Sequence, residues 1–330
     1  MFLVLGATGY IGQAFARELR GRGHPFVPLS RQAFDYTRFD LLFDYVRRLR
    51  PEFLINAAGV SDQAGDDEQL RLQMFEANTV LPQTIGRVCL MTNTPWAHVS
   101  SGGIYSGAKV YDRGEMRVEH DLDRPALRRL FADHKEKFVG FSEVDEPNCS
   151  FRFPPCDFCE GTKALAEEAL QGMERTFIWR SRLPFGERDD PRNLLSTIRA
   201  QANISDHLNS LSHVGDFVRA CLDLIHCRAP FGIYNVVNPG AVTTSQVVGL
   251  IQRILKQARR LKFQSEDSEF FQPRMGAPRS SCVLGVTKLL GAGVKVRPVE
   301  KALEDALKKW TPISASNSAV RAQFDRLLMR

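Results

Sequence analysis

The chain lacks the long apolar segments of a membrane protein. No run approaches the roughly 20 consecutive apolar residues that a membrane-spanning helix needs, and no basic-then-apolar leader precedes the apolar run at residues 2–5. Cysteines are also few: the seven present are odd in number and too sparse for a disulfide scaffold. These absences predict a cytoplasmic protein that neither spans a membrane nor carries a signal peptide.

The chain also lacks a block of one charge. Its net charge of +6 arises from 44 basic and 38 acidic residues that are interspersed, as in the mixed segment 128–137. Arg47, Arg48 and Arg50 close a predicted helix, where cations favour the C-terminal end of the helix dipole. With no internal repeat and no low-complexity segment, the composition is typical of a soluble globular protein without a nucleic-acid surface.

Glycines at three positions follow the first apolar run. Residues 1–12 read Met-Phe-Leu-Val-Leu-Gly-Ala-Thr-Gly-Tyr-Ile-Gly, and a helical pattern of apolar residues comes next. In such a strand–turn–helix unit, Gly6 permits a tight turn, Gly9 lets the backbone approach a pyrophosphate, and Gly12 lets helix and strand pack closely. Since phosphates bind at a helix N-terminus, this segment predicts a dinucleotide cradle.

Strand-like and helical segments alternate along the chain. Strands are expected at 2–5, 25–29, 53–56, 96–100, 176–180, 233–237 and 281–284, and helices at 37–50, 66–91, 125–137, 161–172, 191–202, 214–227, 243–260 and 298–310. This order predicts an α/β fold: a doubly wound, Rossmann-like parallel sheet that binds its ligand at the carboxyl ends of the strands. We expect this domain at residues 1–185, with an extra segment at 106–158, and a smaller, interwoven substrate lobe at 186–330.

Short motifs follow one another in order along almost the whole chain. After the glycine-rich turn come Asn56-Ala-Ala-Gly59, Asn78, Ser100-Ser-Gly-Gly-Ile-Tyr105, Gly161-Thr-Lys163, Asp190-Pro-Arg-Asn193, Asn238-Pro-Gly240 and Ala277-Pro-Arg-Ser280. In this order the sequence resembles the extended short-chain dehydrogenase/reductase family. It is most similar to the nucleotide-sugar reductases, which include dTDP-4-dehydrorhamnose reductase and the reductase half of the plant rhamnose synthases. The resemblance implies NADP-dependent reduction of a 4-keto nucleotide-sugar.

The same resemblance implies a catalytic serine, a tyrosine, and a lysine four residues after the tyrosine. In that family the tyrosine exchanges a proton with the sugar oxygen, and the serine hydrogen-bonds this oxygen. The lysine lowers the pKa of the tyrosine and holds the nicotinamide ribose. Ser101 and Lys163 match the serine and the lysine, but Cys159 stands where the tyrosine is expected.

Because a cysteine stands at this position, the sequence does not identify the residue that donates the proton to the sugar oxygen. A free thiol has a pKa of about 8.5, which Lys163 would lower further, so Cys159 is one candidate. Because its side chain is shorter than a phenol and a weak donor, Tyr105 and Tyr111 are alternatives, and so is a catalytically impaired protein. Cys156 and Cys159 form a single Cys-x-x-Cys pair, for which we expect pocket-wall thiols and no metal.

The choice of cofactor depends on the residues after the second apolar run. No carboxylate occurs between positions 19 and 34, whereas Ser30 and Arg31 offer a hydroxyl and a guanidinium to a 2′-phosphate. We therefore predict NADP, with NAD as the alternative. Asp35 lies either beneath the adenine or at the N-cap of the next helix. The predicted cofactor residues are Gly6, Thr8, Gly9, Tyr10, Ile11, Gly12, Ser30, Arg31, Asp35, Asn56, Ala57, Ala58, Gly59, Asn78, Lys163 and Leu183.

The substrate residues also come from the resemblance. Arg192 and Arg279 lie in segments that face the nucleotide-sugar in the family, where an arginine fork suits a diphosphate. The predicted set also contains Ser101, Gly102, Tyr105 and Asn193. Nucleotide-sugar epimerases, 4,6-dehydratases and a reductase-like regulatory subunit share the scaffold and are alternative functions. The sequence leaves a homodimer open, and we expect the segment 106–158 to cover the mouth of the site, because site residues flank both its ends.

Overall fold

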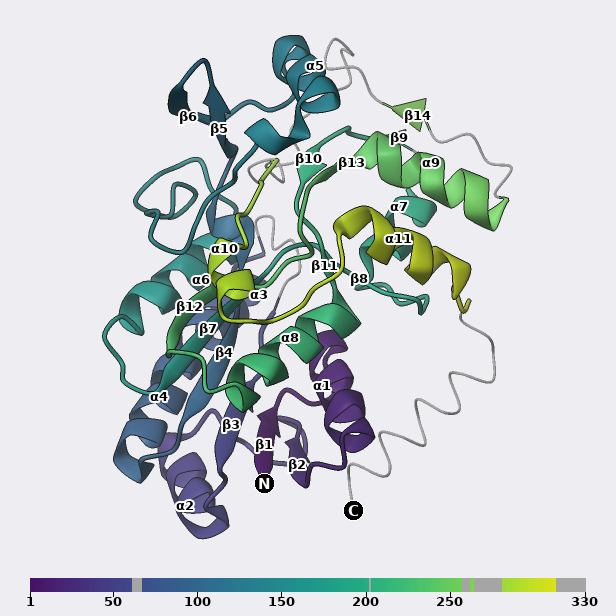
Figure 1. The fold of residues 1–330 in the computed structure, drawn as a ribbon. Helices are drawn as coiled ribbons and strands as arrows, with labels where there is room; N and C mark the ends of the chain where they lie inside the picture. The colour runs from purple at the N-terminus through teal and green to yellow at the C-terminus, as the bar shows by residue number, and fades with distance from the viewer. Residues whose placement is uncertain (61–66, 202, 257–261, 264–280, 313–330) are drawn as a thin grey trace.

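A parallel sheet of six strands lies at the centre of the computed structural model, which describes residues 1–60, 67–201, 203–256, 262–263 and 281–312 (Figure 1). The strand order is β2-β1-β3-β4-β7-β12. After β1 the chain forms β2 on one side of β1 and then crosses to form β3 on the other side. The switch point of the sheet, where the strand order reverses, therefore lies between β1 and β3. The predicted α/β fold is confirmed. Its strands are β1 (Phe2–Leu5), β2 (Phe26–Leu29), β3 (Phe53–Asn56), β4 (Trp96–Ser101), β7 (Thr176–Ser181) and β12 (Gly232–Asn235).

Helices cover both faces of the sheet (Figure 1). The first face carries α1 (Tyr10–Gly21) and α8 (Val214–His226), and the second carries α2 (Phe39–Leu49), α4 (Leu81–Thr92) and α6 (Phe158–Ala169). Successive strand residues point to opposite faces, so Val4 joins the core under α1 while Leu3 joins the core under α2. Among the described residues, no helix is long and apolar enough to cross a membrane.

The single helix predicted at 66–91 is divided into three pieces. They are α3 (Glu68–Phe75), the π-helical turn η1 (Glu76–Val80) and α4. A π-helical turn widens a helix locally and occurs often at functional sites. Here the turn carries Asn78, whose amide group bridges the turn to α6, as described below.

The second half of the chain contributes to both parts of the molecule. Its β12 and α8 belong to the sheet domain, whereas α7 (Leu194–Ala200), α9 (Thr244–Leu255) and α11 (Val299–Lys308) pack together in a separate core. The strand expected at 281–284 forms only isolated bridges, and α10 (Thr287–Gly291) follows it. The division at residue 185 stays a prediction. Short strand pairs complete the lobe: β8 (Pro184–Phe185) with β11 (Ser212–His213), β10 (Leu208–Asn209) with β13 (Val242–Thr243), and β9 (Asn203–Ile204) with β14 (Lys262–Phe263).

The extra segment 106–158 packs on the smaller lobe. It forms the hairpin β5 (Ala108–Asp112) and β6 (Glu115–Glu119), then α5 (Pro125–Asp133) and the short η3 (Lys135–Lys137). Apolar side chains of the hairpin and α5 share one core with Leu208 and Val283 of the lobe. Burial of these side chains draws the hairpin and α5 toward the lobe, and neither lines the cavities described next.

Candidate active site

The glycine-rich turn joins the end of β1 to the start of α1. Gly6 has a φ of +72°, and a Cβ at this position would lie 2.5 Å from the backbone nitrogen of Ala58. A Cβ on Gly12 would overlap the carbonyl group of Gly6, but a Cβ on Gly9 would meet no atom closer than that oxygen, at 3.1 Å. The fold therefore requires Gly6 and Gly12, whereas Gly9 keeps the space before the helix N-terminus free. This arrangement fits a pyrophosphate.

A cavity of about 1040 Å³ extends from this turn past the end of β2. Asp35 accepts hydrogen bonds from the backbone nitrogen and the hydroxyl of Thr37, at 3.2 and 2.5 Å. The N-cap of α2 is Arg38, so the alternative role of Asp35 as the cap is wrong. The predicted residues that line the cavity are Gly6, Thr8, Gly9, Ser30, Arg31, Asp35, Ala57, Ala58 and Gly59.

A second cavity, of about 370 Å³, continues from the first. Both are lined by Gly9 and by residues 57–60, so they form one channel across the carboxyl edge of the sheet. The second cavity brings together residues that lie far apart in the sequence, from α1, β4, α6 and the segment after β7. The predicted residues that line it are Gly9, Tyr10, Ile11, Ala57, Ala58, Gly59, Asn78, Ser101, Cys159, Lys163, Leu183 and Arg192.

Cys159 lies in the first turn of α6. The side chain of Asp157 caps this helix by accepting a hydrogen bond from the Cys159 backbone nitrogen at 2.8 Å. The thiol donates to the carbonyl oxygen of Val60 at 3.4 Å, and Asn78 Nδ2 lies 3.9 Å from the sulfur. Burial raises the pKa of Cys159 more than the nearby Lys163 lowers it. The expectation of a lowered thiol pKa is therefore wrong, and the thiol holds its proton at neutral pH.

Lys163 and Ser101 lie on the same cavity wall as this thiol. Burial lowers the pKa of Lys163, but its interactions with the Cys159 side chain and with the carboxylates of Glu160 and Asp157 raise it above its usual value. The lysine is consequently an ammonium ion. Ser101 ends β4, and its Oγ accepts a hydrogen bond from the backbone nitrogen of Gly103 at 3.0 Å. Ser101 also lines the second cavity, where its hydroxyl adjoins the space for a ligand.

Tyr105 is not placed to replace the missing tyrosine. Its side chain is fully buried and stacks on Phe141, with the ring centroids 4.7 Å apart. Its hydroxyl donates to the Asp145 carbonyl at 2.6 Å and accepts from Arg180 at 3.0 Å. Tyr105 lines neither cavity, and Tyr111 is half-exposed on β5 outside both. The predicted substrate role of Tyr105 is thus not supported, because its hydroxyl belongs to the buried network around Arg180.

Four other predicted residues lie behind the cavity walls rather than in them. Gly12 packs against Gly6, as described above. Asn56 orients the loop, since it accepts from the Ala58 backbone nitrogen at 3.1 Å. A Cβ on Gly102 would overlap Leu284. Asn193 is buried and caps α7 by accepting from the Leu195 backbone nitrogen at 3.0 Å. Arg279 lies outside the described residues.

Arg192 reaches the second cavity with its charge already paired. Its guanidinium donates two hydrogen bonds to Asp190, each 2.9 Å long, and lies 5.8 Å from the centre of the Tyr10 ring. The fork predicted for a diphosphate is therefore engaged by Asp190. Arg192 therefore lines the cavity as one member of an ion pair.

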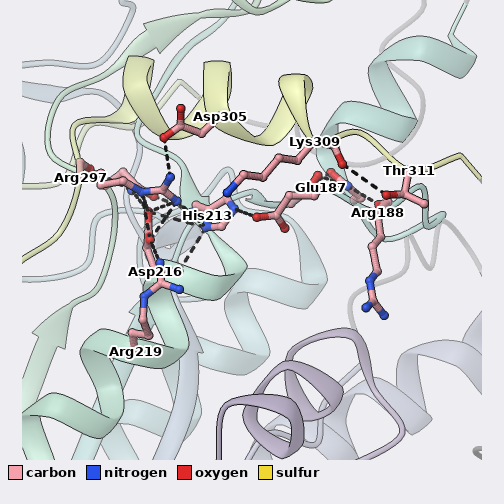
Figure 2. A network of polar contacts seen from close by, with 12 residues as sticks. Glu187, Arg188, His213, Asp216, Arg219, Arg297, Asp305, Lys309 and Thr311 are labelled. Carbon is pink, nitrogen blue, oxygen red and sulfur yellow. Dashed lines mark hydrogen bonds and ion pairs between the residues drawn. The ribbon is translucent and has the colours of Figure 1, made fainter. Parts of the chain in front are cut away.

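A network of ion pairs fixes the loop that precedes Arg192 (Figure 2). His213 Nε2 lies 3.0 Å from Glu187 Oε1. Arg297 contacts Asp216 at 3.0 Å and donates to Asp305 of α11 at 2.8 Å. The network thus ties α8 of the sheet domain to α11 of the lobe. Beside it, the Thr311 backbone nitrogen donates to the Glu187 carbonyl at 2.8 Å.

Several charged or polar residues that line the second cavity are missing from the predicted set: His98, Ser100, Asp157, Glu160, Ser181, Arg182 and Thr197. Glu160 follows Cys159 on α6, and Arg182 follows β7. Arg182 is buried and donates from Nε and Nη2 to Asn209 Oδ1, at 3.2 and 2.9 Å. His98 is uncharged, because burial lowers its pKa to about 3. Two features of the sequence could have identified these residues. Arg182 is a charged residue directly after a predicted strand, and Glu160 is a charged residue next to the candidate catalytic position 159.

All seven cysteines are free thiols. Cys156 is partly exposed and does not line the cavities, whereas Cys149 and Cys159 line the second one. In the part of the chain that the structure describes, no group of three or more His, Cys, Asp and Glu side chains is arranged to hold a metal ion.

The sequence matches a known protein family and known enzymes over most of its length. Residues 1–311 match the family model described as RmlD substrate binding domain. The bifunctional dTDP-4-dehydrorhamnose 3,5-epimerase/dTDP-4-dehydrorhamnose reductase of Arabidopsis thaliana is 25% identical over 292 residues, which cover 87% of this chain and 86% of the relative.

Solved structures with the same fold extend over nearly the whole chain. The UDP-rhamnose synthase of Acanthamoeba polyphaga mimivirus is 18% identical and gives a TM-score of 0.76, covering 93% of this chain and 98% of that one. A dTDP-4-dehydrorhamnose reductase of Bacillus anthracis, solved in complex with NADP, is 19% identical and gives 0.70, covering 94% and 97%. The resemblance found in the motifs is confirmed, and the protein belongs to the RmlD substrate binding domain family.

Proposed function

We propose that the protein is an NADP-dependent reductase of a 4-keto nucleotide-sugar. The observation that carries the proposal is the continuous channel, in which the glycine-rich cradle leads directly to Ser101, Cys159 and Lys163. A dinucleotide in the cradle would place its reactive ring at the junction of the two cavities. The names of the similar proteins, which include dTDP-4-dehydrorhamnose reductase, support the same reaction class.

The side chains at the junction suit the reduction of a carbonyl group. When bound, the nicotinamide supplies a hydride to the carbonyl carbon. The hydroxyl of Ser101 and the ammonium of Lys163 hold the oxygen as negative charge develops on it. Cys159 then gives the oxygen its thiol proton and regains a proton from solvent. The raised pKa of Cys159 favours this role, because an acid must be protonated before the reaction.

The adenosine end of the channel favours NADP over NAD. Ser30 and Arg31 line it where the 2′-substituent of the ribose would lie. The Arg31 side chain is exposed and carries a positive charge that suits a phosphate. Asp35 also lines this end, but its carboxylate is bound to Thr37. A homodimer stays a prediction, which light scattering of the purified protein will test.

Turnover of the dinucleotide tests the proposed function directly. NADPH oxidation is followed through the absorbance of the reduced nicotinamide, with 4-keto-6-deoxy sugars linked to UDP or dTDP as substrates. The product is identified by mass spectrometry. We expect reduction of at least one of these sugars. Absence of turnover in the wild type and in Cys159→Tyr, together with intact NADPH binding, would contradict the proposal.

A non-catalytic dinucleotide-binding protein is the second candidate function. It is favoured by one observation: the tyrosine position holds a short thiol that already donates to the Val60 carbonyl. Such a protein binds NADPH in the same cradle and turns over none of the sugars. The experiment above separates the two functions.

A further inference from the structure

The carboxyl group of Glu160 lies against the turn that carries the catalytic serine. Glu160 occupies the first turn of α6, next to Cys159, and lines the second cavity. A Cβ built on Gly103 would overlap the carboxyl group of Glu160. Gly103 is also the residue whose backbone nitrogen donates to Ser101 Oγ. The acidic group of Glu160 is therefore a neighbour of Ser101, in the space that a side chain at position 103 would fill.

One oxygen of this carboxyl group has no protein partner. Oε2 of Glu160 is buried, and no described protein group hydrogen-bonds it. A buried acceptor without a donor costs free energy, so such atoms in folded proteins usually have a partner. Glu160 as a residue is only partly buried and lines the cavity, so its carboxyl group borders the space in which a ligand with hydroxyl groups would bind.

Three other charged groups on the cavity wall are engaged by protein partners. Arg192 is paired with Asp190, and Asp157 caps α6. Arg182 donates to Asn209, whereas the Lys163 ammonium is the group that the proposed function assigns to the substrate oxygen. The carboxyl group of Glu160 is thus an acidic group of the cavity that lies directly against the Ser101 turn.

We propose that Glu160 is a sugar-binding residue that selects neutral sugars. Its carboxylate accepts hydrogen bonds from sugar hydroxyls beside the carbon that is reduced, and it repels sugars that carry a carboxylate there. In a hexuronic acid the carboxylate is attached to carbon 5, next to carbon 4. The inference rests on the proposed function, because Ser101 must bind the oxygen of carbon 4 for Glu160 to lie beside this position.

Binding of matched ligands tests the inference without turnover. The protein saturated with NADP⁺ is titrated calorimetrically with UDP-glucose and UDP-glucuronic acid, and in parallel with dTDP-glucose and dTDP-glucuronic acid. Repulsion of like charges in a cavity of low dielectric constant predicts at least about 10-fold tighter binding of the neutral sugar by the wild type. Glu160→Gln, which keeps the shape of the side chain, should reduce this ratio to within about 3-fold.

Controls make each outcome decisive. Glu168→Gln on the same helix removes an equal charge at a position outside the cavity and should leave the ratio unchanged. If Glu160→Gln fails to fold, Glu160→Ala replaces it. A wild type that binds both sugars equally, or a ratio unaltered in the Glu160 variant, overturns the inference. Failure of every neutral nucleotide-sugar to bind, with NADP⁺ still bound, overturns the proposed function instead.

Discussion

The two ends of the channel are built from different parts of the chain. At the cofactor end the walls include the glycine-rich turn with Gly6 and Gly9 and the loop 57–59, together with side chains at the end of β2. At the sugar end the walls are side chains, among them Cys159, Glu160 and Arg182. Backbone geometry depends on a few glycines, whereas a side-chain wall can change chemically without altering the fold. The chain carries the three glycines of the cradle, whereas at the sugar end Cys159 stands where the family resemblance predicts a tyrosine.

The most severe change at the cofactor end is Gly9→Val. A branched side chain would fill the space before the N-terminus of α1, so we expect NADPH and NADH binding to fall by at least about 1000-fold, below detection. Fluorescence titration of the folded variant measures this loss. Gly21→Val, at the far end of the same helix where a Cβ has no neighbour within 4 Å, serves as the control. If the folded Gly9→Val variant still bound the dinucleotides, the glycine-rich turn would be a structural feature that does not bind their pyrophosphate.

The corresponding change at the sugar end is Cys159→Ala. Loss of a general acid lowers the rate by about 10² to 10⁴-fold, while the cradle and Lys163 should keep NADPH affinity unchanged. Single-turnover kinetics and a parallel NADPH titration measure the two quantities separately. Cys156→Ala, outside the cavities, should be silent. If Cys159→Ala is also silent and Cys159→Tyr gains activity, the thiol is only a wall of the pocket.

The sugar end also depends on a buried ion pair beneath it. Arg180 donates to Glu167 at 2.6 Å, both side chains are almost fully buried, and Ser100 donates to the same carboxylate at 2.5 Å. Glu167→Gln leaves the guanidinium uncompensated, so the free energy of unfolding should fall by about 3–5 kcal/mol. Urea denaturation measures this loss. Glu168→Gln breaks a partly exposed pair with Arg152 and should cost about 1 kcal/mol or less; equal losses would contradict the argument.

A smaller effect is expected from Arg31→Ala at the cofactor end. Loss of a charge-assisted contact with the 2′-phosphate should weaken NADPH binding by about 10- to 100-fold and leave NADH binding nearly unchanged. Arg38→Ala, whose exposed side chain pairs with Asp40, is the matched control. Equal affinities of the wild type for the two dinucleotides would show that Arg31 makes no such contact.

The smallest expected effect is the pH response of the contact between Glu187 and His213, the N-cap residue of α8 (Figure 2). The hydrogen bond with His213 lowers the pKa of Glu187 from 4.5 to about 2 despite its partial burial. A carboxyl group with a lower pKa in the folded state stabilises the protein above its unfolded pKa, and this contribution is lost as the pH falls from about 4.5 toward 2. Thermal unfolding across this range should show a shallower decline in Glu187→Gln than in the wild type. An identical decline would contradict this role.

Most of the sheet domain follows from the sequence because its periodicity is local. Apolar runs predict the six strands of the sheet, and the helices after them lie within a few residues of their expected positions. The long helix at 66–91 is an exception, because the π-helical turn around Asn78 is formed through contacts with α6. Apolar periodicity carries no information about such a contact.

The sequence by itself determined the dinucleotide cradle, since three glycines and a strand–helix pattern suffice to specify a backbone shape. It also identified Ser101, Cys159 and Lys163 as neighbours through the resemblance to a family. Only the tertiary structure decided that Tyr105 is buried against Arg180 while Glu160 and Arg182 line the cavity. The direction of the Cys159 pKa was likewise decided there, because burial and neighbouring charges arise from segments that meet only after folding.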